Sequence, residues 1–446
     1  MALLTKASGI DLRRVAVIGA GAMGLAAAYH ALKAGHQVVV YEADKVPGGM
    51  AAHFDFGGLS LERFYHFVCK ADRPTFELMH ELGIADKMRW VPTRMGVYMG
   101  GRVHDWGDPI ALLKFPGLSP IQKLRYGLMM FVATRRKSAG ALEHESAKQW
   151  IQSWCGPNVY DELWRPLFDL KFYEFADNIS AAWLWTRIKR VGTSRKSLLQ
   201  EELGYIDGGS ETLVRALVGA IEKAGGSVRL GAPVAEVVVA NGAVKGVRSG
   251  DRVEIYDAVI STIPTPLVSN MIPGLPDAAK KAYDAIKNIG VVCVIFKLKK
   301  SVTRNFWVNV FDPSMNIPGF VEFSRLRSMP DTIVYVPYYM PTTSANWKRS
   351  DADLVDEAFD YLKRVNPLLT DADRIDARVG RLRYAQPVCP PGFGAMIPKT
   401  QTPLAGLQVA DTCSYYPEDR GISESVRWAK LMAAAIDDST VWVPKH

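Results

Sequence analysis

The chain has 446 residues, of which 48% are hydrophobic and 22% are charged, and this is enough apolar material for a globular core. The composition excludes a disordered tail and a small disulfide-stapled scaffold, and the length fits two or three domains. The 54 Lys and Arg outnumber the 46 Asp and Glu, giving a formal net charge of +8, which favours an anionic partner such as nucleic acid, a phosphorylated substrate or a membrane surface.

The cysteines and the first residues of the chain indicate the cellular compartment in which the protein is expected. The 5 cysteines are scattered, with no CxxC pair and no histidine spacing suited to zinc, so we expect a reducing compartment and no metal site. No apolar stretch typical of an export signal opens the chain, and no run of about 18 apolar residues is present that would span a bilayer. The expected localisation is cytoplasmic, either free or peripheral on the inner face of the membrane.

The first unit, residues 13–44, reads as a strand, a tight turn, a helix and a second strand. Its turn carries the pattern GxGxxG in Gly19, Gly21 and Gly24. In a dinucleotide fingerprint these glycines allow the turn, the close approach of a pyrophosphate and the packing of helix on strand. A chance Gly-rich turn is the alternative, but the flanking strands and helix favour a nucleotide site.

Four more residues of this unit are candidate ligands. Ala22 and Met23 open the helix, where free amides and the positive helix end face a diphosphate. Glu42 and Ala43 follow the second strand, and Glu42 stands 18 residues after Gly24, where its carboxylate can accept the ribose hydroxyls of adenosine. The motif alone leaves NAD and FAD open.

A paired-glycine loop, Gly48 and Gly49, comes next, followed by Met50. The stretch YEADKVPGGMAAHFDFGG resembles the flavin amine oxidase-like superfamily, which holds protoporphyrinogen oxidases, phytoene desaturases, amine oxidases and UDP-galactopyranose mutases. The resemblance implies FAD, which we take to be bound non-covalently, with the two glycines beside its flavin end. Many members carry Arg where this chain has Met50.

The middle of the chain continues the resemblance. A GYIDGGS turn at 204–210 leads into an expected helix, 211–224, and then into short strands with hairpin signals between them. In the superfamily this block returns to the nucleotide domain, and the resemblance places Val234 against adenine. The strand at 258–264 is similar to the family's V-I-x-T-x-P motif, which leaves that domain again.

The last segment resembles the second FAD motif of the superfamily. A short strand ends in Asp411, and after a loop Gly421 and Ile422 begin an apolar-periodic helix. The resemblance implies that Asp411 binds the ribityl and pyrophosphate region and that the helix N-terminus faces the pyrimidine edge of the flavin. A helix N-terminus stabilises the negative charge of reduced flavin there.

These segments predict an α/β protein of two interleaved domains. A Rossmann-like FAD-binding domain, made of a parallel sheet plus a β-meander, is expected from residues 12–60, 201–265 and 395–446. An α+β substrate domain with a mixed or antiparallel sheet is expected from residues 61–200 and 266–394, of which 61–200 is rich in helical patterns.

Two residues are candidates for catalysis. His66 follows the paired-glycine loop where relatives run a loop beside the flavin, and neutral imidazole exchanges protons near pH 7; its alternative is packing among the aromatic residues around it. Arg420 precedes the last helix and could neutralise substrate or flavin charge, or instead pair with Glu418 or Asp419. True amine oxidases commonly place a Lys near the flavin, and an approximate match puts Cys293 there, which counts against simple amine oxidation.

Other features bear on the substrate. Five aromatic side chains are expected either to wall a pocket for an apolar or ring-shaped substrate or simply to form core: Trp307, Tyr335, Tyr338, Tyr339 and Tyr384. Residues 109–142 hold six basic residues and no acid, and within 122–134 four apolar residues recur at helical spacing: Leu124, Leu128, Phe131 and Val132. A basic amphipathic helix suits an anionic membrane surface, and a helix packed on the protein is the alternative.

The predicted function is an FAD-dependent dehydrogenase, oxidase or desaturase that takes hydride from an apolar, lipid-linked or ring-shaped small molecule, with oxygen or a quinone as electron acceptor. The alternative is an isomerase similar to UDP-galactopyranose mutase, which acts on a sugar nucleotide, and Arg325 and Arg327 are its compact candidates for the diphosphate. A non-catalytic nucleotide-binding scaffold is the third reading. No nucleic acid is expected as a partner, because the basic excess lies in an apolar segment.

Overall fold

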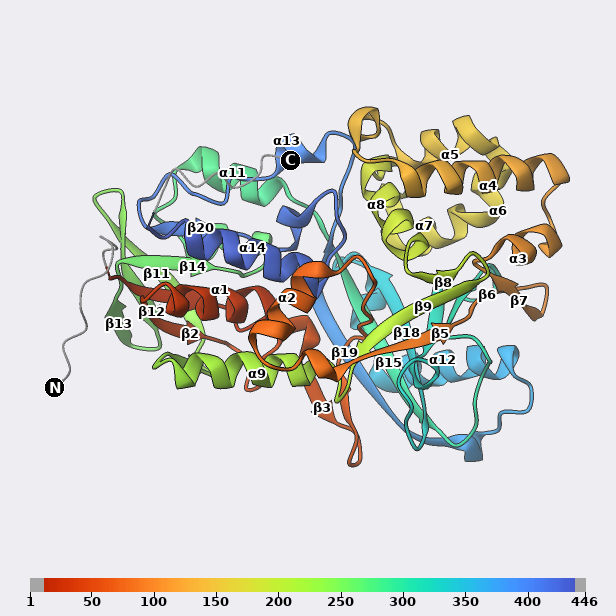
Figure 1. Ribbon diagram of the computed structural model, residues 1–446, viewed down its shortest axis with the longest axis horizontal. Helices are drawn as coiled ribbons and strands as arrows, with labels where there is room; N and C mark the ends of the chain where they lie inside the picture. Colours follow the sequence, from red (N-terminus) through yellow and green to blue (C-terminus); the bar gives the residue numbers. More distant parts are fainter. Residues whose placement is uncertain (1–11, 438–446) are drawn as a thin grey trace.

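The computed structural model describes residues 12–437, in which the chain forms two lobes (Figure 1). One lobe is built around a parallel sheet and the other around a larger mixed sheet with a group of helices beside it. This is the predicted α/β class, with the predicted combination of a parallel and a mixed sheet.

The parallel sheet has five strands in the order β10-β2-β1-β14-β20. Their bounds are β1 Arg14–Ile18, β2 Gln37–Tyr41, β10 Ser227–Arg229, β14 Ala258–Ser261 and β20 Leu407–Val409. Val15, Ala16 and Val17 of β1 have no exposed surface, because β1 lies in the centre of the sheet with neighbours on both sides. The five strands come from three distant parts of the chain, 14–41, 227–261 and 407–409.

Helices α1 (Ala22–Lys33), α9 (Ser210–Lys223) and α14 (Ile422–Ala434) pack beside this sheet, with α1 lying between α9 and α14 (Figure 1). α2 (Arg73–Glu81) packs against α14. The predicted β-meander is confirmed as an antiparallel sheet of β11 (Val234–Ala240), β12 (Ala243–Ser249) and β13 (Arg252–Ile255).

The second large sheet has seven strands in the order β19-β15-β18-β17-β16-β6-β7. It is mixed, because β16 pairs parallel with β6 while the other pairs are antiparallel. Its strands are β6 Met95–Met99, β7 Arg102–Trp106, β15 Asn288–Leu298, β16 Trp307–Val310, β17 Gly319–Glu322, β18 Thr332–Met340 and β19 Arg374–Pro387. Helix α12 (Asp351–Val365) packs on β15 and β19.

Six helices between β7 and β8 form the group at one end of the molecule (Figure 1). They are α3 Pro109–Lys114, α4 Pro120–Arg135, α5 Ala147–Cys155, α6 Pro157–Leu163, α7 Arg165–Phe172 and α8 Ala181–Gly192. Three short helices elsewhere are α10 Val268–Met271, α11 Asp277–Ala285 and α13 Phe393–Met396.

The helix-rich prediction for 61–200 holds for 109–192 but is wrong for residues 88–106, which form strands. Hairpin β6–β7 extends the mixed sheet, and β5 (Met88–Thr93) joins β8 (Arg195–Ser197) and β9 (Gln200–Ile206) in a three-stranded sheet. A further pair, β3 (His53–Asp55) and β4 (Ser60–Glu62), follows the paired-glycine loop. Most of these strands are short, and β5 and β6 also pair with β9 and β16, which are far away in sequence, so local periodicity gives a weak signal.

Candidate flavin and substrate site

A cavity of about 780 Å³ runs from the glycine turn after β1 to the aromatic side chains of the mixed sheet. All the predicted cofactor residues except Gly24 line this cavity. They are Gly19, Gly21, Ala22, Met23, Glu42, Ala43, Gly48, Gly49, Met50, Val234, Asp411, Gly421 and Ile422. Three segments that are distant in sequence therefore meet around one space, as the resemblance implies.

The glycine turn has the dimensions that a pyrophosphate needs. Gly24 lies behind the turn, and a Cβ added to it would lie only 1.8 Å from the carbonyl oxygen of Gly19. A Cβ on Gly49 would lie 3.1 Å from the Cα of Gly21, so the paired-glycine loop passes directly over the turn. Gly19 has φ +101°, a left-handed conformation that favours glycine. Side chains at Gly19 and Gly24 would force the turn away from its neighbours, and one at Gly49 would push the two glycine loops apart, so the close-packed turn fits a dinucleotide cradle.

Two acids that the resemblance assigns to the ribose and ribityl groups are held rigidly. Glu42 accepts hydrogen bonds from the amides of Ala20 at 2.7 Å and Asp44 at 2.9 Å, which fix it at the end of β2. Asp411 accepts from the amide of Thr265 at 2.6 Å and from the amide of Cys413 at 2.8 Å. Each carboxylate still faces the cavity and retains lone pairs, so both fit a polyhydroxyl chain.

Two helix N-termini point their free amides at this cavity. α1 begins after Gly21 and α14 begins after Gly421, and neither helix has a side-chain cap. Gly21, Ala22, Gly421 and Ile422 all line the cavity. Uncapped N-termini carry unsatisfied N–H groups and a partial positive charge, which suits the diphosphate at one end and an anionic ring at the other.

Arg63 was missed by the sequence analysis. It lies at the cavity wall, its amide donates to the carbonyl oxygen of Ala52, and its guanidinium pairs with Asp44. The guanidinium lowers the pKa of the Asp44 carboxyl. Arg63 thus places a cation beside the paired-glycine loop. In many members of the resembling superfamily, the Arg at the position of Met50 belongs to that loop. The sequence signal of Arg63 was weak, because it follows the glycine pair by more than ten residues.

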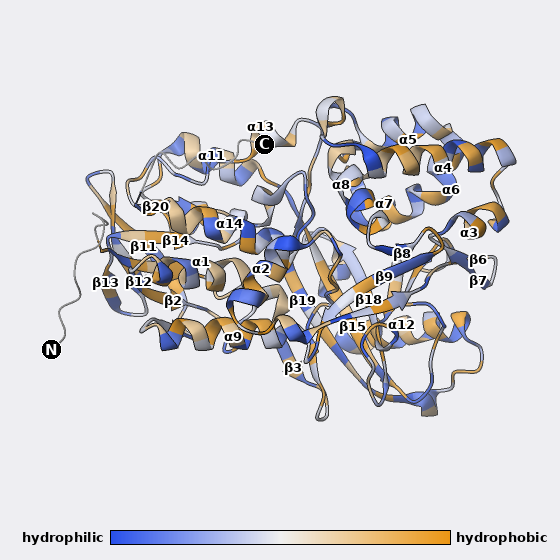
Figure 2. Ribbon diagram, in the orientation of Figure 1, coloured by the Kyte–Doolittle hydropathy of each residue, from blue (hydrophilic) through white to orange (hydrophobic). Residues whose placement is uncertain are grey.

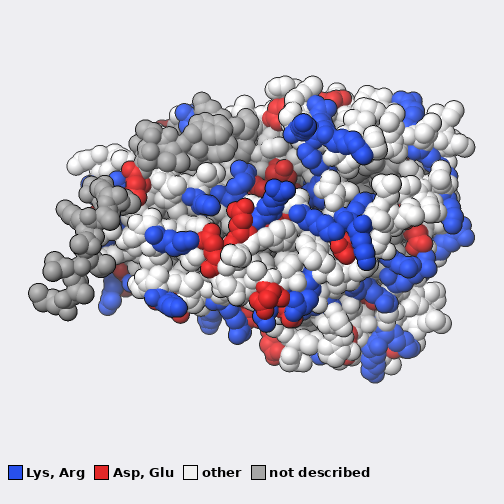
Figure 3. Space-filling view, in the orientation of Figure 1, with Lys and Arg blue, Asp and Glu red and all other residues white. Residues whose placement is uncertain are grey.

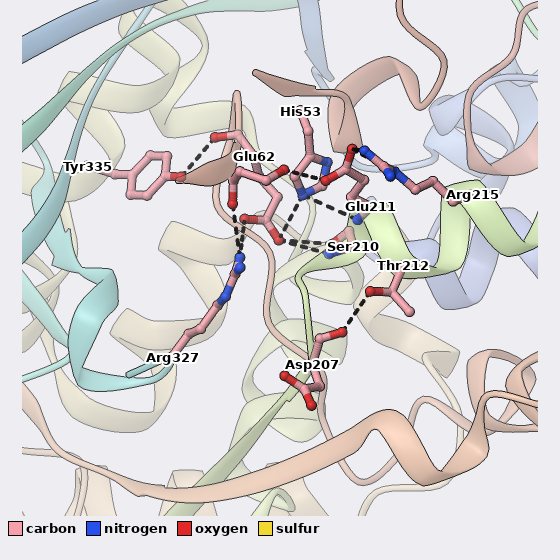
Figure 4. Close-up of polar contacts among 10 residues, drawn as sticks. His53, Glu62, Asp207, Ser210, Glu211, Thr212, Arg215, Arg327 and Tyr335 are labelled. Atoms are coloured by element: carbon pink, nitrogen blue, oxygen red, sulfur yellow. Dashed lines mark hydrogen bonds and ion pairs between the residues drawn. The ribbon is translucent and has the colours of Figure 1, made fainter. Parts of the chain in front are cut away.

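A buried carboxylate, Glu62, anchors the start of the segment that carries His66 (Figure 4). Glu62 accepts from the amide of Ser210 at 2.9 Å, and its oxygens lie 3.6 Å from His53 and 3.8 Å from Arg327. Burial raises the pKa of Glu62, but His53 and the Ser210 amide outweigh it and lower that pKa to about 2. The charged carboxylate therefore joins β4 to the N-terminus of α9.

His66 lines the cavity together with the aromatic residues around it, Phe64, Tyr65 and Phe67. Its Nδ1 atom is buried and makes no hydrogen bond within residues 12–437. Burial lowers the pKa of His66 below 6.5, so the imidazole is neutral near pH 7. The His66 side chain therefore both borders the cavity and packs against its aromatic neighbours, so the two alternatives do not exclude each other.

Arg420 also lines the cavity. Its guanidinium donates to the side-chain oxygen of Gln386 and to the hydroxyl of Tyr339, the latter at 3.4 Å. The expected alternative is wrong: among the described residues Arg420 has no ion pair with Glu418 or Asp419, and Asp419 pairs with Arg187 instead. Arg420 is therefore a cation whose hydrogen-bond partners are neutral.

The cavity wall carries no lysine from β15. Cys293 lines the cavity, whereas Lys297 lies outside it and pairs with Asp331 at 3.2 Å. The match between Cys293 and the lysine position of true amine oxidases stays a prediction.

The aromatic wall is smaller than expected. Trp307, Tyr339 and Tyr384 line the cavity. Tyr335 and Tyr338 are instead buried in the core, with 0% and 4% of their surface exposed. Strand alternation places Tyr338 on the face opposite to Tyr339. Tyr335 lies on the same face as Tyr339 but is covered by the rings of Tyr65 and Phe323, whose centroids lie 5.7 and 5.5 Å from its own.

Three further cations of the cavity were missed, namely Lys171, Arg187 and Arg190. Arg190 is bound by Asp72 through two hydrogen bonds of 2.9 and 2.6 Å, and Arg187 pairs with Asp419. These residues stand on α7 and α8, and no local spacing relates them to the acids or to the cofactor motifs. Only the tertiary fold brings them to the cavity.

The predicted helix in 122–134 is confirmed as α4, and its apolar residues face outward. Leu124 is 73% exposed, Leu128 52% and Phe131 53%. Ile110 and Leu113 of α3 are exposed as well. Figure 2 shows hydrophobic stretches along both α3 and α4. None of the six basic residues of 109–142 forms an ion pair with a described acid. Figure 3 shows Lys and Arg side chains over this end of the molecule. Within residues 12–437, no helix is both long and apolar enough to cross a bilayer.

Comparisons with known proteins agree with this architecture. The model of the flavin-containing amine oxidoreductase family matches residues 24–410. The chain is 27% identical to 15-cis-phytoene desaturase of Synechococcus elongatus over 388 residues, which cover 79% of this chain and 80% of the desaturase. Its fold is similar to that of reduced UDP-galactopyranose mutase, with a TM-score of 0.74 at 15% identity over 95% of both chains.

Putrescine oxidase bound to putrescine has the same fold, with a TM-score of 0.71 at 18% identity over 96% of this chain and 99% of that one. The structural likenesses concern the fold, because their identities are low. The family model, in contrast, spans most of the chain and includes the glycine-pair loop and the strand before Asp411. The chain therefore belongs to the flavin-containing amine oxidoreductase family and is an FAD-dependent oxidoreductase.

Proposed function

We propose that this enzyme binds FAD non-covalently and takes hydride from an apolar carbon centre of a lipid-like or ring-shaped substrate. The observation that carries the proposal is the single continuous cavity, which has a dinucleotide cradle at one end and aromatic walls at the other. When bound, the flavin supplies a two-electron acceptor for the hydride, and the protein supplies orientation and charge.

Non-covalent binding is supported by the cysteines. Cys389 and Cys413 are buried and neither belongs to the cavity wall. Burial raises the pKa of both thiols, and of Cys293 in the cavity wall, well above the usual range, so all three are poor nucleophiles. Acid precipitation of the purified yellow protein is expected to release all its flavin into the supernatant, and flavin retained in the pellet would contradict this binding mode.

The residues at the flavin end have distinct tasks in the proposal. His66, neutral near pH 7, accepts a proton at its imidazole when the substrate loses hydrogen. Arg420, held by Gln386 and Tyr339, offsets negative charge at the start of α14. Trp307 and Tyr384 exclude water and hold an apolar body.

We also propose that α3 and α4 lie on an anionic membrane surface, from which the substrate is taken. The exposed side chains Ile121, Leu124 and Phe131 would enter the lipid, while the unpaired basic residues would meet lipid phosphates. Arg195 extends this surface: it donates to the carbonyl oxygens of Gly107 and Leu198, which ties the exposed tip of the β8–β9 hairpin to the start of α3.

The deciding experiment follows the visible spectrum of the purified protein under anaerobic conditions. A flavin spectrum that isoprenoid or fatty lipids bleach, and that oxygen or a quinone restores, is expected. The step that restores the colour identifies the electron acceptor. A colourless protein that cannot rebind FAD would refute the proposal.

The same assay tests the mutase alternative, in which pre-reduced flavin is required and UDP-galactopyranose is isomerised without net oxidation. Of the two arginines considered for that chemistry, Arg327 lines the cavity but pairs with Glu62, and Arg325 lies outside the cavity and pairs with Glu322. This placement counts against these two arginines as the diphosphate ligands of a mutase, because each guanidinium is paired with a glutamate.

A further inference from the structure

The substrate end of the cavity contains an unbalanced positive charge. Lys171 lines the cavity, yet within residues 12–437 it has no hydrogen bond and no ion pair. Its Nζ atom lies 5.1 Å from the ring centroid of Trp183, 5.2 Å from that of Tyr339 and 5.3 Å from that of Phe172. The ammonium group is thus held by aromatic rings and keeps all three N–H donors available.

Two arginines share the same rings. The Cζ atom of Arg187 lies 5.1 Å from the Trp183 centroid, and the Cζ atom of Arg420 lies 5.9 Å from the Tyr339 centroid. Arg187 is neutralised by Asp419, but Arg420 bonds to neutral groups only. Three cations therefore meet one carboxylate in a space enclosed by aromatic side chains.

We propose that Lys171 and Arg420 form a subsite for an acidic head group, a carboxylate or a phosphate, attached to the apolar body of the substrate. The inference rests on the proposed function, whose substrate class it narrows. Such a group would accept the free hydrogen bonds of Lys171 and balance the charge that the protein leaves unpaired. The same field repels an ammonium group, so an amine such as putrescine is a poor fit.

Proton binding should accompany occupancy. In the unliganded protein, burial and the charge of Arg187 lower the pKa of Lys171 well below its usual range. An anion placed against the ammonium raises that pKa, so at a pH between the unliganded and liganded pKa values binding takes up a proton, and affinity falls as the pH rises through this range. The titratable or charged groups that face Lys171 come from several elements: Arg187 of α8, Tyr339 of β18, Cys389 after β19, and Asp419 and Arg420 before α14.

Calorimetry on the full-length, flavin-loaded protein tests the subsite with four probes that share one tail: decanoate, decyl phosphate, decanol and decylamine. Both acids are expected to bind about 10- to 100-fold more tightly than decanol, with decylamine weakest. Lys171→Met should abolish this preference, and Lys171→Arg should keep it. Titrations in buffers of different ionisation enthalpy should show proton uptake for the acids alone.

Lys148→Met is the matched control. Lys148 also lies over an aromatic ring, that of Tyr160 at 5.8 Å, but it pairs with Asp177 outside the cavity. This variant should bind the four probes like the unmodified protein.

Equal binding of acids and decanol, an unchanged preference in Lys171→Met, or tighter binding of UDP-galactose than of either acid would each overturn the subsite. Calorimetry reports binding without turnover, so these outcomes are separate from a failure of flavin reduction, which would refute the proposed function.

Discussion

Replacing Gly24 by Ala tests the cofactor cradle most directly. The added Cβ would lie 1.8 Å from the carbonyl oxygen of Gly19, where ordinary contacts are 3.4–4 Å, and 3.1 Å from Oγ1 of Thr262. Helix α1 and the turn after β1 must therefore move apart by roughly 1.5 Å, since a backbone carbonyl cannot rotate away as a flexible side chain can. The turn then no longer presents its amides to the diphosphate in the same geometry.

Overpacking of this kind costs about 1–3 kcal/mol. If the strain falls on the turn, the dissociation constant for FAD should rise roughly 5- to 150-fold. Titration of apoprotein with FAD, followed by the quenching of flavin fluorescence, measures this constant. Far-UV circular dichroism of the apoprotein checks that the variant still folds.

Gly219→Ala provides the matched control. Gly219 lies on the exposed face of α9, and nothing lies within 4 Å of a Cβ added there. The substitution should leave the FAD dissociation constant within about twofold and stabilise the helix by about 1 kcal/mol, because Ala has a higher helix propensity than Gly. A Gly24→Ala variant that binds FAD as tightly as the Gly219→Ala variant would show that the turn does not hold the cofactor in this way.

Three further outcomes are expected. His66→Gln should slow flavin reduction by about 10²- to 10⁴-fold. Because burial lowers the pKa of His66, the rate of flavin reduction by the unmodified enzyme should stay level as the pH falls to 6.5 and decrease only below that pH. A stopped-flow pH profile measures this dependence, and a midpoint above 6.5 would contradict it. Glu201 is buried and desolvation raises its pKa from 4.5 to about 7, so ionising it destabilises the fold increasingly between these values. Glu201→Gln should therefore leave the thermal midpoint unchanged at pH 4.5 and raise it at pH 8, where the gain amounts to about 3 kcal/mol at most; equal midpoints at pH 8 would refute the assignment. Replacing Leu124 and Phe131 by Ser should reduce co-sedimentation with vesicles rich in anionic lipid at low salt, and the same two residues would be shown irrelevant if the variant pellets like the unmodified protein.

The local parts of the site could be predicted from the sequence. Gly19, Gly24 and Glu42 lie within one strand–helix–strand unit, so their spacing alone places them around a turn. The family resemblance extended the predicted site to Asp411, which is far from the turn in the sequence. The helix in 122–134 was predictable from its periodicity, but its outward-facing apolar side was not, because periodicity does not tell which face meets the protein.

The residues at the substrate end of the cavity could not be predicted from the sequence, for a physical reason. Lys171, Arg187 and Arg420 stand on α7, on α8 and before α14, and each is unremarkable within its own segment. What distinguishes them is the balance of charges in the space they share, and this depends on the packing of the helical group against the mixed sheet. Strands 88–106 were missed similarly, because β5 pairs with residues 201–206 and β6 pairs with residues 307–310, which are far away in sequence.

The interleaved order of the parallel sheet affects how the protein is synthesised. Strand β20 at 407–409 and helix α14 leave the ribosome long after β1 and α1, and yet β20 completes the sheet and α14 packs against α1. Until then, the apolar side of α1 has no α14 to cover it and the cradle lacks Asp411 and the second helix N-terminus. FAD can therefore act as a late fold-completing ligand, captured only by chains in which α14 has been translated.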